Sequence, residues 1–175
     1  PAHHCGIVGL KPTYGRVSRH GVVPMSWSMD HVGPMARTGE DCGLMLQAIA
    51  GYDPKDHTSS KARVPDYIAG LKIGVRGLRI GVLRHQFLDL EEEVVQAIDA
   101  GLEVLSDLGA IVHDIVLARS ARAEILYMNI AQPEACAYHL PWMRTRIEDY
   151  DDTCRTRLEQ GLAVPASDYV AAQRE

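Results

Sequence analysis

Apolar residues recur at helical spacing after Thr38, with polar residues between them. Positions i, i+3, i+4 and i+7 of this pattern are Cys42, Met45, Leu46 and Ile49. Thr38 is a good N-cap residue, and Asp41 three residues later can complete a pair that resembles a capping box. Gly51 stands where a helix commonly ends, so the pattern predicts a helix between Thr38 and Gly51. Residues 52–64 are polar and predict an exposed loop, and residues 65–71 predict a short helical turn.

The most regular helical pattern runs from residue 90 to residue 108. Its apolar positions, three or four residues apart, are Val94, Ile98, Leu102, Leu105 and Leu108. Glutamates at 91–93 fit the first turn of a helix, where the helix dipole favours negative charge, and Gly109 can end it. Runs of Leu, Ile and Val at 78–83 and 110–117 predict a strand on each side. A strand, a helix and a strand over roughly 40 residues predict a βαβ unit with a parallel strand pair and a right-handed crossover.

Helical composition returns after residue 120, in segments 121–138, 151–160 and 167–174. Pro133 lies inside the first segment, where it either kinks one helix or separates two. A short Gly-Leu-Ala-Val-Pro link at 161–165 joins the other two segments. The chain ends at Glu175 without a C-cap signal and begins with Pro instead of Met, so we expect it to be truncated at both ends.

Residues 1–37 have a different character, because glycine and proline interrupt them every few positions. Gly6–Leu10 is an apolar run that predicts a short buried strand, and the turn residues after it end that strand. Val17 and Gly21–Val23 predict further short extended pieces. With the βαβ unit, these segments assign the chain to the α/β class.

Composition and charge exclude several classes of function. Hydrophobic residues are 46% of the 175 residues and charged residues are 23%, the balance of a soluble globular protein. The net charge of −5 argues against a nucleic-acid surface, which carries a basic stripe. No apolar run approaches the roughly 18 residues of a membrane-spanning helix. We therefore expect neither a membrane partner nor direct contact with nucleic acid.

The cysteines and histidines give no metal or redox signature. The cysteines are widely spaced, without a Cys-x-x-Cys pair: Cys5, Cys42, Cys136 and Cys154. We expect free buried thiols in a reducing cytoplasm. His3, His4 and Cys5 are adjacent, but consecutive residues of a strand point to alternate faces and cannot converge on one ion. No metal site is expected.

Common catalytic and nucleotide motifs are not matched. Gly9-Leu-Lys-Pro-Thr13 lacks the spacing of a phosphate loop, and Pro12 follows its lysine where a helix should open. Gly74, Gly77 and Gly81 precede or interrupt a strand, whereas the glycines of a dinucleotide fingerprint follow one. The chain has no Gly-x-Ser-x-Gly elbow, so no serine is marked as a nucleophile by its surroundings.

Several segments together closely resemble the amidase signature family. The most specific lie at the start of the chain: Pro1-Ala2, Cys5–Ser18, Gly21–Pro24, Ser28–Asp30 and Gly33–Thr38. The resemblance continues to the end of the chain through Glu40-Asp41, Gly51–Pro54, Pro65–Tyr67, Gly77–Val82 and Ala137–Trp142. His3-His4 departs from the small or aromatic pair usual in the family, and Pro133 interrupts a helix that is usually continuous.

The resemblance implies an α/β/α sandwich around a large mixed, twisted sheet, with residues 1–175 as a partial amidase signature domain. Members are serine hydrolases that cleave carboxamides with a serine nucleophile, a bridging serine in a cis peptide and a lysine base, and they need no cofactor. Pro1-Ala2 matches the end of the family's Ser-x-Arg-x-Pro-Ala pattern. The nucleophile would therefore lie four residues upstream of Pro1, with the other two catalytic residues further upstream. None of the three would belong to this chain.

The resemblance also implies that the segment around Trp27, Ser28 and Asp30 lies at the acyl pocket, so these three are the candidate substrate-binding residues. For Trp27 ordinary packing is an equal alternative. For Asp30 the role of a structural hydrogen-bond acceptor is favoured over a catalytic one.

Three functions stay open. The first is a free-standing cytoplasmic amidase, acting on a small-molecule aryl or alkyl carboxamide, either alone or as a homodimer. The second is the glutamine-hydrolysing A subunit of a tRNA-dependent amidotransferase, which works with partner subunits. Trp27 and His31 depart from the small residue and the glutamine expected in that subunit, which favours the first function. The third is a non-catalytic fragment or pseudoenzyme.

Overall fold

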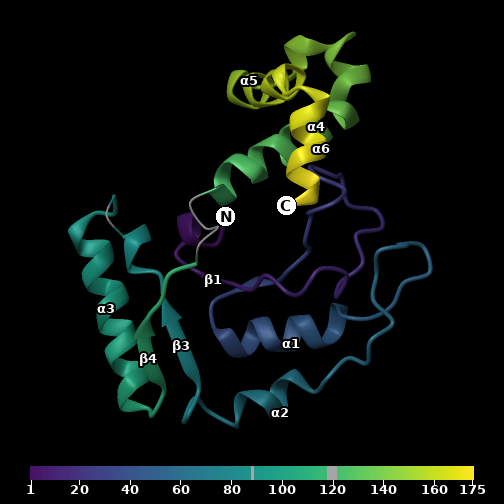
Figure 1. The fold of residues 1–175 in the computed structure, drawn as a ribbon. Coiled ribbons are helices and arrows are strands. Elements are labelled where there is room, and N and C mark those ends of the chain that lie inside the picture. The colour runs from purple at the N-terminus through teal and green to yellow at the C-terminus, as the bar shows by residue number, and fades with distance from the viewer. Residues whose placement is uncertain (88, 118–121) are drawn as a thin grey trace. The chain divides into compact units, whose positions relative to one another are not determined.

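The computed structural model describes residues 1–87, 89–117 and 122–175 (Figure 1). They fall into two compact units, one formed by Pro1–Tyr67 with Arg122–Glu175 and the other by Ile68–Ala121. The helices are α1 Gly39–Ile49, α2 Tyr67–Leu71, α3 Glu92–Asp107, α4 Ala123–Met143, α5 Asp152–Gln160 and α6 Ala166–Arg174. The strands are β1 Val8–Gly9, β2 Met35–Ala36, β3 Arg79–Val82 and β4 Ile111–Asp114. This mixture of helices and strands confirms the α/β class.

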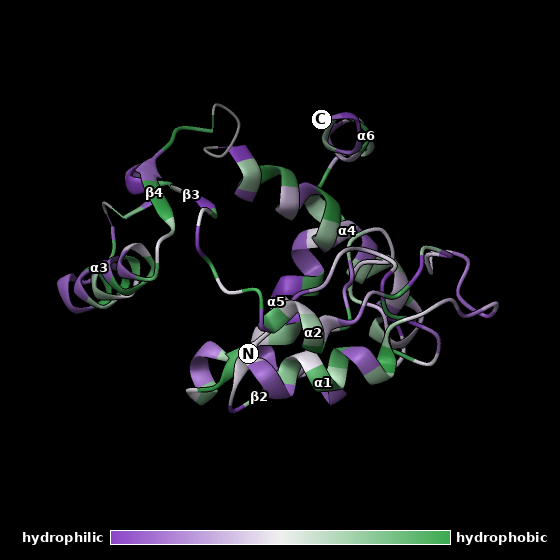
Figure 2. Ribbon diagram, turned by 90° about the horizontal axis from the view of Figure 1, so that it is seen from below, coloured by the Kyte–Doolittle hydropathy of each residue, from purple (hydrophilic) through white to green (hydrophobic). Residues whose placement is uncertain are grey.

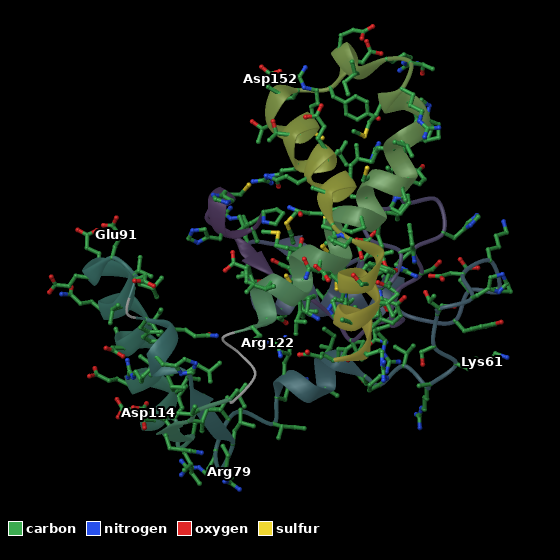
Figure 3. All side chains as sticks on the ribbon, turned by 45° about the horizontal axis from the view of Figure 1, so that its top comes forward. Lys61, Arg79, Glu91, Asp114, Arg122 and Asp152 are labelled. Carbon is green, nitrogen blue, oxygen red and sulfur yellow. The ribbon has the colours of Figure 1, made fainter. Side chains whose placement is uncertain are left out.

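The unit of residues 68–121 contains the predicted βαβ arrangement. Strands β3 and β4 are parallel (Figure 1), with Arg79 opposite Ile111 and Val82 opposite Asp114. The side chains of Arg79 and Asp114 are labelled in Figure 3. Helix α3 connects them, and Glu92 and Glu93 lie in its first turn as expected. In Figure 2, α3 carries both green (hydrophobic) and purple (hydrophilic) residues, as expected for an amphipathic helix. The sequence pattern therefore predicted both the elements and their direction.

In the other unit, the helix predicted after Thr38 is present as α1. The Thr38 hydroxyl accepts the Asp41 backbone N–H at 3.1 Å and donates to the Asp41 carboxylate at 2.8 Å. On its apolar face Cys42 and Leu46 are buried, whereas Met45 and Ile49, on the same face, are more than two-fifths exposed. The cap and the helix are confirmed, but only part of the predicted apolar face is covered.

Four expectations for the first 64 residues need correction. The predicted buried strand Gly6–Leu10 is only Val8–Gly9, which is exposed and pairs antiparallel with β2. Gly21–Val23 forms no strand, because Gly21 adopts a positive φ of 82° in a turn. His3–Cys5 is a short 3₁₀ helix instead of a strand, and its three residues are exposed. The loop 52–64 is not fully exposed either, since it carries buried polar side chains: Asp56 and Ser59.

Helix α4 is continuous through both Pro133 and Pro141, so Pro133 does not divide it into two helices. Ala121, with which that segment was expected to start, lies outside the described residues. α4 packs against α5 and α6. The turn after α5 also lies close to α4, because a Cβ added at Gly161 would overlap the Gln132 carbonyl oxygen. Helices α5 and α6 confirm the other two predicted segments.

The core of this unit lies between α4 and α5. Its buried members are Ala135, Cys136, Met143 and Leu158, and the partly buried Leu140, Ile147 and Tyr150 pack around them. All four cysteines are unpaired, as expected. Cys42 and Cys136 are buried, but Cys5 and Cys154 are exposed, so the expectation of burial was wrong for two of the four. Within the described part of the chain, no helix is both long and apolar enough to cross a bilayer.

Candidate functional site

The most completely buried carboxylate of the described chain is that of Glu134, on α4. The residue is 0% exposed and faces the segment that holds the candidate site residues. Its Oε2 accepts the Ser26 hydroxyl at 2.6 Å and the Ser28 backbone N–H at 3.1 Å. Its Oε1 accepts the Ser28 hydroxyl at 2.7 Å. Two residues far apart in sequence from α4 are thus fixed to one carboxylate.

Helix α6 completes the surroundings of Glu134. The Tyr169 hydroxyl donates to Oε1 at 2.9 Å, and the Gln173 side-chain amide donates to the same oxygen at 3.3 Å. Gln173 also donates to the Tyr169 hydroxyl oxygen at 3.3 Å. Helices α4 and α6 and the 26–28 segment therefore meet at one buried carboxylate.

Hydrogen bonds, not an opposite charge, stabilise this carboxylate. Burial raises the pKa of Glu134, but the hydrogen bonds from Ser26, Ser28 and Tyr169 outweigh burial and hold the pKa below its ordinary value. Among the described residues, no lysine, arginine or histidine forms an ion pair with it. Glu134 is therefore ionised at neutral pH and acts as an acceptor for all of its neighbours.

Asp30 closes the other side of the same turn. Its carboxylate accepts the backbone N–H of Met25 at 2.8 Å and that of Ser26 at 3.0 Å. The Ser26 carbonyl in turn accepts the N–H groups of Met29 and Asp30. Both Asp30 oxygens are thus occupied by the backbone, which is the structural acceptor role favoured from the sequence.

A second anchor holds the Trp27 carbonyl. The Arg19 guanidinium donates to it at 2.6 Å and lies over the Tyr14 ring, 4.9 Å from its centroid. The Tyr14 hydroxyl donates to the same carbonyl at 3.3 Å. The backbone on both sides of the Trp27 side chain is therefore fixed by hydrogen bonds.

Arg19 is itself held by the loop after α1. Its backbone N–H donates to Asp56 at 2.7 Å, and its guanidinium donates to the Thr58 hydroxyl at 2.8 Å. Hydrogen bonds from Thr58 and from the Arg19 backbone, together with the Arg19 charge, lower the pKa of Asp56 to about 2. The buried polar residues of the loop 52–64 thus serve to fix Arg19.

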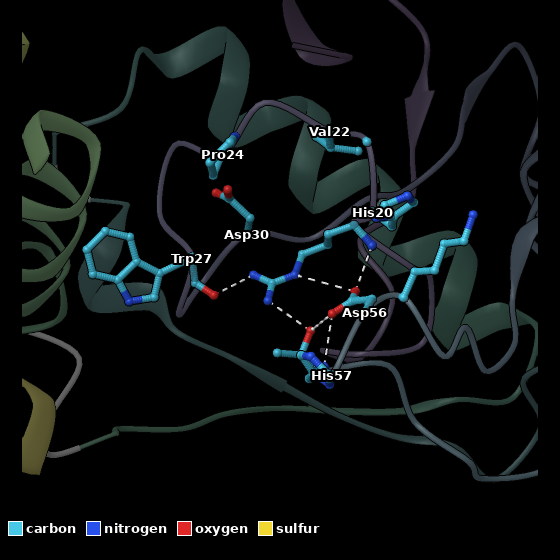
Figure 4. A pocket seen from close by; sticks show the side chains of 11 residues that line it. His20, Val22, Pro24, Trp27, Asp30, Asp56 and His57 are labelled. Atoms are coloured by element: carbon cyan, nitrogen blue, oxygen red, sulfur yellow. Dashed lines mark hydrogen bonds and ion pairs between the residues drawn. The ribbon is translucent and has the colours of Figure 1, made fainter. Parts of the chain in front are cut away.

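A cavity of about 360 Å³ lies between these anchors (Figure 4). Val22, Pro24 and the Trp27 side chain contribute apolar surface, and His20 and His57 are among the polar residues that line it. Trp27 lines the cavity and is 48% exposed. The cavity therefore combines one aromatic wall with a polar rim.

A larger groove of about 640 Å³ lies on the other side of Pro24, against α4 and α5. Its apolar surface comes from residues such as Met25, Met128, Ala131 and Leu158. Groups of three or more His, Cys, Asp or Glu side chains able to hold a metal ion are absent from the described ranges.

The three candidate residues differ in whether they line the cavity and in which groups their polar atoms bind. Trp27 and Asp30 line the cavity and Ser28 does not. The Ser28 hydroxyl and backbone N–H both donate to Glu134, and both Asp30 oxygens accept backbone N–H groups. Of the three, the Trp27 indole is the group left facing open space.

The sequence interpretation missed Glu134, Tyr169 and Gln173. One signal was present: Glu134 is a lone carboxylate among small apolar residues of a helix, at a position that buries it. A buried carboxylate requires hydrogen-bond donors or a cation nearby. Nothing in the sequence identified α6 as the source of those donors, because that pairing depends on the tertiary fold.

Comparison with known proteins identifies the class. A family model described as Amidase matches residues 1–174, and the chain belongs to this family of amidase signature amidohydrolases. It is 44% identical over 176 residues to an amidase from Pseudomonas putida, covering 99% of this chain and 38% of that protein. It is 47% identical over 138 residues to the glutamyl-tRNA(Gln) amidotransferase A subunit from Geobacter sp. (strain M21), covering 78% of this chain and 28% of that protein.

A solved structure shares the same fold. It is described as a vestigial protein complex that reveals the evolutionary origins of an s-triazine catabolic enzyme. The TM-score is 0.85 at 35% identity, over 97% of this chain and 36% of that one. The chain thus spans less than two-fifths of the length of each of these relatives.

Proposed function

We propose that residues 1–175 are part of a serine amidohydrolase that converts a carboxamide and water to a carboxylate and ammonia. The observation that carries the proposal is the 44% identity with the Pseudomonas putida amidase across 99% of the chain. The relative's name supplies the reaction class. We further propose a cytoplasmic location, which the four unpaired cysteines support.

The proposed mechanism has two stages. A serine four residues upstream of Pro1 attacks the amide carbon, forming an ester bond, while the C–N bond breaks and the nitrogen leaves as ammonia after taking up the serine proton. That proton travels through the bridging serine and the neutral lysine, which loses its own proton readily when buried. Water then hydrolyses the ester and releases the carboxylate. Residues 1–54 would form a wall of the pocket downstream of the nucleophile.

A second candidate is the A subunit of an amidotransferase, which would release ammonia from glutamine. The 47% identity with the Geobacter protein supports it, although that match covers only 78% of the chain. Trp27 and His31 replace the small residue and the glutamine expected in that subunit. We therefore favour the free-standing amidase, as a monomer or a homodimer acting on a small-molecule amide.

The test uses the longer protein that contains this chain, purified without partners. Ammonia release is measured from acetamide, propionamide, benzamide and glutamine, with a Ser→Ala variant at the proposed nucleophile as control. We expect turnover of at least one simple amide, abolished in the control. Turnover of glutamine alone, and only with added partner subunits, supports the second candidate. No turnover in either setting favours a pseudoenzyme and contradicts both.

A further inference from the structure

The residues on either side of Trp27 are bonded to the same buried carboxylate. Ser26 and Ser28 each donate their hydroxyl to Glu134, at 2.6 and 2.7 Å. Ser26 is 1% exposed and Glu134 is 0% exposed, whereas Trp27 between the two serines is 48% exposed. The contacts draw both flanking residues inward and leave the indole on the outside of the turn.

The turn that carries Trp27 has little freedom to move. The Ser28 N–H is held by Glu134, the Ser26 N–H by Asp30, and the Trp27 carbonyl by Arg19. Because the backbone that carries the indole is fixed in this way, a ligand that packs against Trp27 does not have to order that backbone. The turn therefore presents Trp27 from a preorganised backbone at the wall of the 360 Å³ cavity.

Several polar groups near Trp27 already have protein partners. The carboxylates of Asp30 and Asp56 accept protein N–H and O–H groups, and the Arg19 guanidinium donates to Trp27 and Thr58. Pro24 and Val22 line the cavity together with Trp27 and add apolar surface to it, while His20, Lys55 and His57 form its polar rim. Such a surface favours an aromatic ring, which gains offset or edge-to-face contact in addition to area burial.

We propose that Trp27 is the specificity-determining residue for an aryl carboxamide, and that Glu134 is the positioning residue that holds its indole at the cavity wall. This inference rests on the proposed amidase function and deepens it by naming the substrate class. Glu134 touches no substrate; it acts through the two serines on either side of Trp27.

The test measures substrate preference in the longer protein. The preference ratio is kcat/KM for benzamide divided by kcat/KM for propionamide, determined for wild type, Trp27→Ala, Glu134→Gln, Ser28→Ala and the double variant of Trp27 and Glu134. Glu124→Gln is the matched control, because Glu124 lies exposed in the first turn of the same helix. Labelling of the nucleophile with a fluorophosphonate counts intact active sites in each preparation.

We expect Trp27→Ala to lower the preference ratio about five- to tenfold, chiefly through KM for benzamide, as expected for the loss of an aromatic pair. Glu134→Gln should lower the ratio in the same direction, and Ser28→Ala less so. The double variant should match Trp27→Ala alone, because the two residues act through one contact. Glu124→Gln should keep the wild-type ratio.

Two results overturn the inference. One is an equal loss for both amides per labelled site in Glu134→Gln and Ser28→Ala, which is what a purely structural role produces. The other is an unchanged ratio in Trp27→Ala. If the wild type neither turns over an amide nor reacts with the fluorophosphonate, the proposed function fails and this inference fails with it; turnover with an unmoved ratio removes this inference alone.

Discussion

The hydroxyl of Tyr169 on α6 donates a 2.9 Å hydrogen bond to the buried carboxylate of Glu134 on α4. Burial, and then the hydrogen bond and negative charge of Glu134, raise the pKa of Tyr169. The phenol therefore stays protonated at neutral pH and remains a donor. This contact ties the last helix of the chain to the carboxylate that also holds Ser26 and Ser28.

We expect Tyr169→Phe to lower the free energy of unfolding by about 1 kcal/mol, the usual net value of one hydrogen bond or slightly more. Glu134 keeps its other donors in this variant, so the loss stays small. Tyr127→Phe is the control, since Tyr127 is exposed and lies on α4. Urea unfolding of the longer protein measures the stability of both variants. An equal effect of the two substitutions would show that the Tyr169 hydrogen bond to Glu134 does not stabilise the fold.

Gly161 is required where the turn after α5 meets α4. An alanine Cβ would overlap the Gln132 carbonyl oxygen and lie 2.7 Å from the Cys136 Cβ, so the backbone must shift. We expect Gly161→Ala to destabilise the protein by about 1–3 kcal/mol, the range for overpacking.

The matched control is Gly101→Ala, on α3. Nothing lies within 4 Å of a Cβ added there. Alanine exceeds glycine in helix propensity by up to about 1 kcal/mol, so this variant should be as stable as wild type or more stable. Thermal unfolding midpoints of both variants check the pair, and a tolerated Gly161→Ala would show that α4 and the turn are not in close contact.

The low pKa of Asp56 predicts that the free energy of unfolding decreases at acid pH. Its pKa is about 2 in the folded protein against an ordinary value of 3.8. A depressed folded pKa stabilises the protein above the unfolded value and loses that contribution as the pH falls from about 4 to about 2. Denaturant unfolding between pH 2 and pH 6 should show less loss of stability in Asp56→Asn than in wild type. Asp107→Asn, an exposed substitution, should follow wild type; identical profiles for all three would refute the prediction.

The sequence predicted local structure well where the signal was local. Thr38 with Asp41, and the glutamates before Val94, marked helix starts that the structure contains. The βαβ unit followed from element order alone. Pro133 was ambiguous, because a proline costs a helix one hydrogen bond but packing against α5 and α6 can offset that loss, and α4 is continuous.

The expectations were wrong where contacts between residues far apart in sequence determine the local structure. Gly6–Leu10 contains only a two-residue strand, because strand length depends on the paired partner, here β2. Asp56 and Ser59 are buried because the loop packs on Arg19 and on itself, which composition does not reveal. The site residue Trp27 was named from family resemblance, but its support by Glu134 joins positions more than a hundred residues apart.

The 175-residue chain on its own should be catalytically inactive, because the proposal assigns no catalytic residue to it. Large apolar residues such as Val23, Ile73 and Val116 are more than two-thirds exposed, so we also expect self-association. Light scattering tests the second expectation. Ammonia release from benzamide and propionamide above that of a boiled sample would show that the catalytic assignment is wrong.

The most direct measurement locates the nucleophile in the longer protein. A fluorophosphonate forms a covalent bond to an activated serine, and mass spectrometry of the digested protein identifies the labelled peptide. The account predicts a single labelled serine four residues before Pro1, on a peptide that continues into Pro1-Ala2. A label on any serine within residues 1–175, or no label in a protein that still releases ammonia from amides, would contradict it.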